Sequence, residues 1–244
     1  MFHVPDLCSR LQLTRRSASL ELDTNMIKGI IFDMDGVLIN TPELAWRSHN
    51  LLLSSFKTHV SDEAIPEYLG RSLIDQVNLL RKNFNIDINV EEYIKEFEED
   101  AQHYMSNIQK NEALVNLMEK LKKKYVLGVA TSSNKDRAST ILKNLGVSEF
   151  FNAVITADDV KKHKPDPAIF LEAAKKLNIT PNESVVVEDA LNGIEAAKSG
   201  NMRTIGLVTK YLSAETLGEA DLVIDSLEDL SEKLEGIEGE NLSV

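Results

Sequence analysis

The sequence of 244 residues contains a single cysteine, Cys8, so the chain cannot form an intramolecular disulfide. Cysteine this scarce favours a reducing compartment, and we expect a cytoplasmic protein. The sequence also lacks any run of 18 or more apolar residues, the length that a membrane-spanning helix needs. We therefore expect no membrane partner.

Basic residues are too few and too dispersed to predict a nucleic-acid-binding surface. The 27 Lys and Arg residues are outnumbered by 39 Asp and Glu residues, and the formal net charge is -12. Nucleic-acid affinity depends on a basic stripe that meets the phosphate backbone, and the sequence contains none. We expect a monomer that binds no nucleic acid, although a local cation would still allow it to bind a small phosphate ester.

Two aspartates, Asp33 and Asp35, follow the apolar run at residues 30–32, and Gly36 comes directly after them. Side chains alternate along a strand, so both carboxylates are expected on one side at its carboxyl end. That end is where open α/β sheets bind ligands. Two carboxylates this close repel each other and need a cation, a shared proton or a catalytic task. The pair by itself fits either a catalytic site or an ordinary acidic turn.

Three later segments carry polar side chains at comparable positions. The apolar run at residues 126–130 ends in Thr131 and Ser132, and the run at 185–187 ends in Glu188 and Asp189. Between the two runs, Lys164 is followed by Pro165, Asp166 and Pro167, which predicts a rigid loop before a helix. Carboxyl ends of parallel strands meet at one edge of a sheet, so these side chains are expected to converge.

Apolar runs alternate with helical patterns from residue 113 onward, which predicts an α/β fold with a parallel sheet covered by helices on both faces. Between the first run and the second, the pattern is entirely helical and too long for a simple crossover. We expect an inserted all-α cap domain at 42–112, a Rossmann-like core at 26–41 and 113–235, an N-terminal extension at 1–25 and a flexible tail at 236–244.

In these four motifs the chain resembles the haloacid dehalogenase-like superfamily of phosphatases and phosphomutases. The signatures occur in the family's order, namely Asp-x-Asp-Gly, Thr/Ser, Lys-Pro and an acidic pair, and the resemblance covers about residues 26–207. It implies a Rossmann-like core with a small helical cap. It also implies a phosphohydrolase in which Asp33 is the nucleophile, Asp35 is the general acid and base, and Thr131, Ser132 and Lys164 bind the phosphate.

The same resemblance bears on the cofactor and the substrate. Mg²⁺ prefers oxygen ligands and keeps several waters, so few carboxylates suffice to bind it. We expect Mg²⁺ at Asp33 and Asp189, with the Asp35 carbonyl and Glu188 as further candidates. Related caps carry a substrate-contacting loop at the position of Arg71, so we expect this arginine to contact a small phosphorylated metabolite.

Two alternatives to a sugar-phosphate phosphatase remain open. The acidic motifs also resemble those of β-phosphoglucomutase, but the mutases usually carry a histidine where this chain has Ala45. A mutase must also exclude water while its intermediate reorients. A catalytically inactive binding subunit would be expected to have lost a motif residue, and here all are present. The phosphatase is therefore the preferred interpretation.

Overall fold

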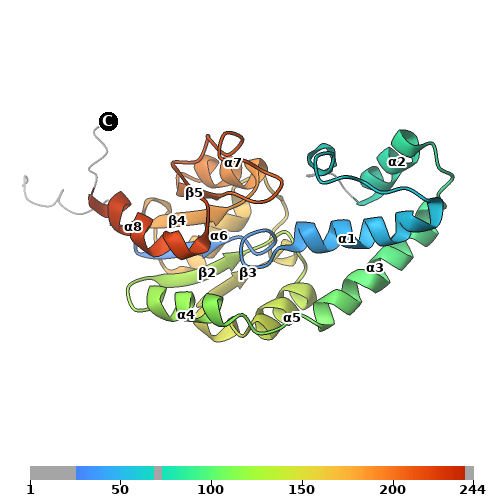
Figure 1. Ribbon diagram of the computed structural model, residues 1–244. Helices are drawn as coiled ribbons and strands as arrows, with labels where there is room; N and C mark the ends of the chain where they lie inside the picture. The colour runs from blue at the N-terminus through green and yellow to red at the C-terminus, as the bar shows by residue number, and fades with distance from the viewer. Residues whose placement is uncertain (1–25, 69–72, 240–244) are drawn as a thin grey trace, which may run out of the picture.

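The computed structural model describes residues 26–68 and 73–239, and its centre is a six-stranded sheet in which every strand pair is parallel (Figure 1). The strand order is β3-β2-β1-β4-β5-β6. This arrangement confirms the predicted α/β fold with a parallel sheet. The strands are β1 (Gly29–Phe32), β2 (Val126–Ala130), β3 (Ala153–Ile155), β4 (Ser184–Glu188), β5 (Arg203–Leu207) and β6 (Leu222–Ile224).

Helices cover both faces of the sheet, and alternate residues of β1 point to opposite faces. Ile30 and Phe32 belong to a hydrophobic cluster with the first set of helices, whereas Ile31 belongs to a cluster with the second set. Because both faces are buried, the central strands carry continuous apolar runs instead of alternating with polar residues, as in residues 30–32 of β1 and 185–187 of β4. The first set is α4 (Glu112–Leu121), α5 (Lys135–Leu145) and α8 (Leu230–Gly239), and the second is α6 (Ala168–Leu177) and α7 (Leu191–Ser199).

The path of the chain creates a crevice beside β1. The chain passes from β1 to β2 and β3 on one side of the sheet, then returns to form β4 against the other side of β1. The β1–β4 boundary is therefore a topological switch point, and ligands bind outside the carboxyl ends of strands at such points. Asp33 follows β1 directly, and its backbone N–H donates to the Val187 carbonyl of β4 at 2.9 Å.

An inserted helical segment, residues 41–106, lies beside the sheet and not over either face (Figure 1). It contains α1 (Thr41–Leu53), α2 (Leu73–Phe84) and α3 (Val90–Ser106), and α1 and α3 pack along each other. The segment has a hydrophobic cluster of its own, which includes the buried residues Trp46, Leu53, Val77 and Leu80. It therefore has its own core, separate from the two clusters of the sheet.

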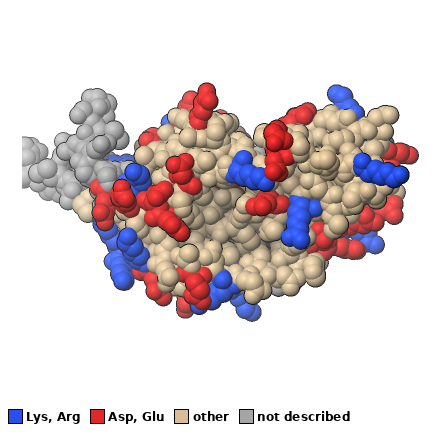
Figure 2. Space-filling model, in the orientation of Figure 1, with Lys and Arg blue, Asp and Glu red and all other residues tan. Residues whose placement is uncertain are grey.

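The helical segment also contacts the sheet-bearing part away from the connecting residues. Tyr211, from the loop after β5, is a member of the segment's hydrophobic cluster. The neighbouring Lys210 forms an ion pair with Asp62 of the segment, 2.6 Å between Nζ and Oδ2. The face shown in Figure 2 has a notch between the two parts and carries Lys and Arg interspersed with Asp and Glu.

Two predicted boundaries differ from the structure. Residues 62–68 were expected to be helical, but only a 3₁₀ turn forms at Ile65–Glu67. So short a segment gains little from helix formation, and burial of Ile65 and Tyr68 in the neighbouring cluster decides its shape. Helix α8 continues to Gly239, past the predicted start of the tail at 236. The other 3₁₀ turns are Ser54–Phe56, Ser148–Phe150, Ala157–Asp159, Pro181–Glu183 and Leu227–Asp229.

Within the described ranges, no helix combines the length and the hydropathy required to cross a bilayer.

Candidate active site

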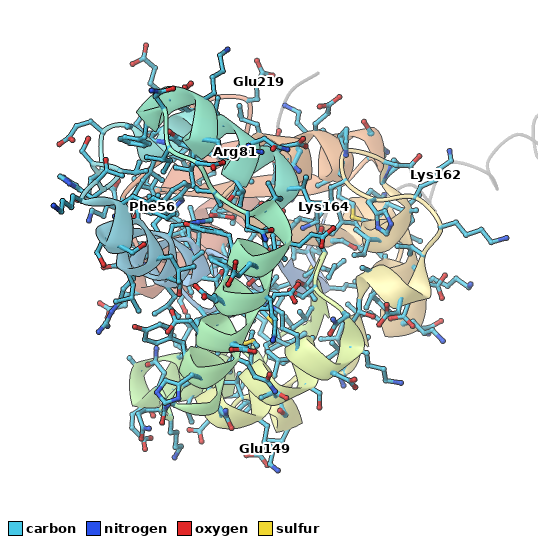
Figure 3. All side chains as sticks on the ribbon, turned by 90° about the vertical axis from the view of Figure 1, so that its right-hand side faces the viewer. Phe56, Arg81, Glu149, Lys162, Lys164 and Glu219 are labelled. Atoms are coloured by element: carbon cyan, nitrogen blue, oxygen red, sulfur yellow. The ribbon has the colours of Figure 1, made fainter. Side chains whose placement is uncertain are left out.

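Lys164 joins two buried carboxylates at the switch point of the sheet. Its Nζ donates to Asp33 Oδ1 at 2.5 Å and to Glu188 Oε1 at 2.6 Å. Only 4% of the Lys164 side chain is exposed, compared with 75% for Lys162 in the same loop. Figure 3 shows this contrast, with Lys164 inside the molecule and Lys162 projecting from its edge. The structure thus brings together the first, third and fourth sequence motifs.

Burial and charge act in opposite directions on this cluster. Burial raises the pKa of Asp33 well above its usual value, and the Lys164 ammonium only partly opposes that effect. For Lys164, burial alone would lower the pKa, but the carboxylates of Asp33 and Glu188 outweigh it and raise the pKa. The lysine therefore stays charged, and the site holds a fixed positive charge beside the nucleophile candidate.

Asp35 is held by the loop after β2 and by the first turn of α5. Its Oδ2 accepts from Ser133 Oγ at 2.8 Å and from Thr131 Oγ1 at 3.3 Å. Its Oδ1 accepts from Arg137 at 2.8 Å. Burial raises the pKa of Asp35, but the Arg137 charge and these hydrogen bonds outweigh it, so that the net shift is downward. In this structure Asp35 is therefore an anion with fixed orientation.

Ser133 and Arg137 were not among the predicted site residues. Asn134 caps α5 by accepting from the Arg137 N–H at 2.9 Å. This cap places Arg137 in the first turn of a helix that starts directly after the Thr131 loop, so its side chain reaches the same sheet edge. An arginine three residues after a capping asparagine was the available signal. Sequence alone does not tell it from a solvated surface arginine.

The predicted phosphate-binding hydroxyls lie at the carboxyl end of β2. Thr131 is buried, and its Oγ1 accepts from the Ser133 N–H at 3.1 Å besides donating to Asp35. Ser132 is exposed. Their role in binding phosphate stays a prediction. Arg71, the predicted substrate contact, lies outside the described residues.

The acidic pair after β4 has two different environments. Glu188 accepts hydrogen bonds at both of its oxygens. Lys164 donates to Oε1, and the backbone N–H of Ala190 donates to Oε2 at 2.8 Å. Asp189 forms no ion pair within the described part of the chain, and burial, followed by the charge of Glu188, raises its pKa to about 7. Gly36 has φ of 94°, and a Cβ at this position would overlap the Asp189 carboxylate. A glycine is therefore required at residue 36.

The carboxylates at this edge of the sheet fit Mg²⁺ only in part. Among residues 26–68 and 73–239, no group of three or more His, Cys, Asp or Glu side chains is arranged to hold a metal ion. Glu188, one of the predicted ligands, is paired with Lys164 instead. Asp33 and Asp189 fit the ion, because both are buried carboxylates, the ligand type that Mg²⁺ prefers, and Mg²⁺ needs few protein ligands. The Lys164 bond to Asp33 uses Oδ1, whereas both oxygens of Glu188 accept hydrogen bonds.

A cavity of about 280 Å³ opens between the sheet edge and the inserted helical segment. Asp35 and Arg137 line it from the sheet side. The opposite wall comes from α1 and α3 and includes Leu44, Phe97 and Met105. The acid–base candidate therefore faces a space large enough for a small ligand.

Comparison with known proteins places this site in a family. Residues 30–207 match the model of the haloacid dehalogenase-like hydrolases. A phosphorylated carbohydrates phosphatase from Thermotoga maritima is 30% identical over 200 residues, which are 81% of this chain and 93% of that protein. Pyrophosphatase PpaX from Bacillus velezensis is 28% identical over 208 residues, covering 84% and 94% of the two chains. The structure of β-phosphoglucomutase from Clostridium difficile matches with a TM-score of 0.65 and 28% identity, covering 86% of this chain and 98% of that one.

Proposed function

We propose that this chain, which belongs to the haloacid dehalogenase-like hydrolase family, is a magnesium-dependent phosphatase acting on a small sugar phosphate or a similar metabolite. The observation that carries the proposal is the buried Lys164, bonded to both Asp33 and Glu188 at the ligand-binding edge of the sheet. A fixed cation at such an edge stabilises the charge of a transferring phosphoryl group. The carbohydrate phosphatase among the relatives supports the substrate class.

In the proposed first step, a carboxylate oxygen of Asp33 attacks the phosphorus of the ester. The phosphorus–oxygen bond to the leaving alcohol breaks as the Asp33–phosphorus bond forms. Asp35, an anion in this structure, must take up a proton when the ester binds, and it gives this proton to the leaving oxygen. Asp35, now ionised, then takes a proton from a water whose oxygen attacks the aspartyl-phosphate. This second step releases inorganic phosphate and restores the Asp33 carboxylate.

The other site residues bind the phosphoryl group and hold it in position for the attack. Lys164 neutralises charge on the phosphoryl oxygens, and the Thr131 and Ser132 loop, at the start of α5, binds them further. When Mg²⁺ is bound at Asp33 and Asp189, it supplies positive charge that offsets the carboxylates and the phosphate. The single cysteine supports placing the reaction in the reducing cytoplasm.

We further propose that residues 42–112 act as a cap over this edge. Their separate hydrophobic cluster and the cavity between α3 and Asp35 support this role. A cap limits the access of bulk water and brings additional contacts to the substrate.

The proposal is tested by replacing the nucleophile candidate. Asp33→Asn should lower phosphate release from sugar phosphates by roughly a thousandfold or more, because the amide cannot form the covalent intermediate. Asp87→Asn, at a fully exposed position, is the matched control and should leave the rate unchanged. Circular dichroism should show the same helix content for both variants. Phosphate release at the wild-type rate from Asp33→Asn would exclude the covalent mechanism.

The second candidate is a phosphosugar mutase, which the likeness to β-phosphoglucomutase favours. Phosphorus NMR of the products separates the two. A phosphatase accumulates inorganic phosphate, whereas a mutase accumulates an isomeric sugar phosphate in the presence of its bisphosphate activator.

A further inference from the structure

We infer that the alcohol released by this enzyme is compact and uncharged and carries an apolar face. The inference rests on the proposed phosphatase function and concerns only which esters fit the site. It comes from the lining of the cavity between the sheet edge and the inserted helical segment.

The position of the cavity identifies which end of the ester it receives. Asp35, the proposed proton donor to the leaving oxygen, lines the cavity, whereas Asp33 and Lys164 are not part of its wall. The phosphoryl group would lie by Asp33 and Lys164, and the ester oxygen by Asp35. The rest of the leaving alcohol would then extend into the cavity.

The charge of the lining argues against a second anionic group on the ligand. Among the described residues of the wall, the only charged side chains are Asp35 and Arg137. They are bonded to each other at 2.8 Å, so the one cation is already neutralised. A carboxylate or a second phosphate in the cavity would lose its hydration without gaining an opposite charge from the described wall, which is strongly unfavourable.

The remaining lining favours contact with an apolar face. The α3 wall presents Phe97, Tyr104 and Met105, each only partly buried by the protein itself, and Leu44 and Ile108 lie beside them. An aromatic ring or the carbon–hydrogen face of a sugar would cover these surfaces. The volume of about 280 Å³ lies at the lower end of ligand pockets, which limits the alcohol to about one ring.

Thr41 provides one polar contact in this wall. Its side chain is buried, and its Oγ1 makes no hydrogen bond of ordinary geometry, although it lies close enough to Asp35 to help lower the pKa of that group. Buried hydroxyls are usually hydrogen-bonded. Asp35, whose pKa the Thr41 hydroxyl helps to lower, is the partner within reach, so this hydroxyl adds to the polar side of the cavity at Asp35.

The first experiment measures binding, so that it does not depend on turnover. The Asp33→Asn variant with Mg²⁺ is titrated calorimetrically with benzyl phosphate, sorbitol 6-phosphate and 6-phosphogluconate. The last two are both open chains and differ only at C1, where one has a hydroxymethyl group and the other a carboxylate. We expect both uncharged alcohols to bind at least tenfold more tightly than 6-phosphogluconate. Binding of 6-phosphogluconate within threefold of sorbitol 6-phosphate would overturn the uncharged character. Binding of benzyl phosphate tenfold weaker than sorbitol 6-phosphate would overturn the apolar face.

A gain-of-charge variant tests whether the preference for uncharged alcohols originates in the cavity wall. Ala101 lines the cavity on α3, whereas Gln102, the next residue, is exposed and outside the lining. Ala101→Lys should strengthen binding of 6-phosphogluconate about tenfold, and Gln102→Lys, with the same change in net charge, should not. Equal effects of the two variants would mean that the net charge of the protein, and not the cavity wall, sets the preference.

A loss-of-contact variant tests the apolar wall. Phe97→Ala should weaken binding of benzyl phosphate at least fivefold, while Phe56→Ala, an exposed aromatic outside this cavity (Figure 3), should leave it unchanged. Because Phe97 also packs on His49, Phe97→Leu serves as the folded variant if Phe97→Ala unfolds. Unchanged binding in the folded Phe97 variant would overturn the inference.

Phosphate release by the wild-type enzyme, measured on the same three esters, separates the two proposals. If no ester is hydrolysed, the proposed function fails, and the order of the three dissociation constants still decides the inference. If all three are hydrolysed with equal kcat/KM, the function stands and the inference fails.

Discussion

The guanidinium of Arg137 connects Asp35 to the inserted helical segment. It donates to Asp35 Oδ1 at 2.8 Å, and its other terminal nitrogen reaches the Met105 sulfur of α3 at 3.2 Å. The Met105 carbonyl in turn accepts from Asn144 of α5 at 2.9 Å. The acid–base candidate and the end of α3 thus share one arginine, and we treat Arg137 as a positioning residue.

The first prediction concerns this arginine. Arg137→Ala should lower kcat about ten- to a hundredfold, because it removes a charge-assisted hydrogen bond of about 1.5–3 kcal/mol and leaves Asp35 held at one oxygen, by Ser133 and Thr131. KM should change little, since the contact is to Asp35 and not to the phosphate. Arg137→Lys should restore part of the rate. Steady-state kinetics on one sugar phosphate measure kcat and KM separately, and Lys143→Ala on the same helix is the control. A change in KM without a change in kcat would contradict the role of Arg137 in positioning Asp35.

The second prediction concerns Lys164. Lys164→Met should lower the free energy of unfolding by about 3–5 kcal/mol, because it leaves the carboxylates of Asp33 and Glu188 buried without their cation. Urea denaturation at pH 8 measures the loss. Lys162→Met, in the same loop but exposed, should cost far less, because its pair with Asp166 lies at the surface, where solvent screens the charges. Similar losses in the two variants would contradict the role of burial.

The third prediction concerns the metal. Chelator should abolish phosphate release, and Mg²⁺ should restore it. Mg²⁺ should also stabilise the wild-type fold, by about 2.7 kcal/mol at a concentration 100 times its dissociation constant. Asp189→Asn should remove most of this stabilisation, because the carboxylate with no ion pair among the described residues is lost, whereas Asp87→Asn should retain it. Full activity in excess chelator would refute the metal requirement.

The fourth prediction concerns His49, which is fully buried in the helical segment between Tyr93 and Gln76. Burial lowers its pKa to about 4, and the hydrogen bond that its Nε2–H donates to Gln76 Oε1 opposes this only in part. The unfolded chain, with a histidine pKa of about 6.5, binds more protons between these two values, so stability falls as the pH is lowered from about 6.5 to 4. The contribution of His49 to this loss should be about 3 kcal/mol.

Urea denaturation at several pH values measures the slope. In His49→Gln the amide keeps hydrogen-bonding capacity but does not titrate, so the slope between pH 6.5 and 4 should flatten relative to wild type. The same substitution at the exposed His59 should leave the wild-type slope. A slope that is unchanged in His49→Gln would show that other groups cause the acid sensitivity.

Local patterns explain how much of the fold was predictable. The strand Val126–Ala130 coincides with the apolar run at 126–130, and the helix Ala168–Leu177 begins directly after Pro167, where the sequence predicts a loop before a helix. Continuous apolar runs and a proline before the first turn are short-range signals. The segment at 62–68 was mispredicted because distant packing on the helical cluster, and not local propensity, determines its conformation.

The candidate site divides in the same way. Asp33, Lys164 and Glu188 were all identified from the sequence, because each stands next to an apolar strand or directly before two closely spaced prolines, and the sheet brings their segments to one edge. Ser133 and Arg137 were missed, since their importance comes only from contact with Asp35, about a hundred residues away in the chain.

The sequence by itself determined the parallel α/β core and the residues at the ends of its strands, because hydrophobic periodicity and short motifs act over a few residues. The tertiary structure alone decided that Lys164 bridges two carboxylates, that Arg137 holds Asp35 as an anion, and that an apolar wall on α3 faces that anion. These relations depend on which distant side chains become neighbours when the chain folds, and on the loss of water between them.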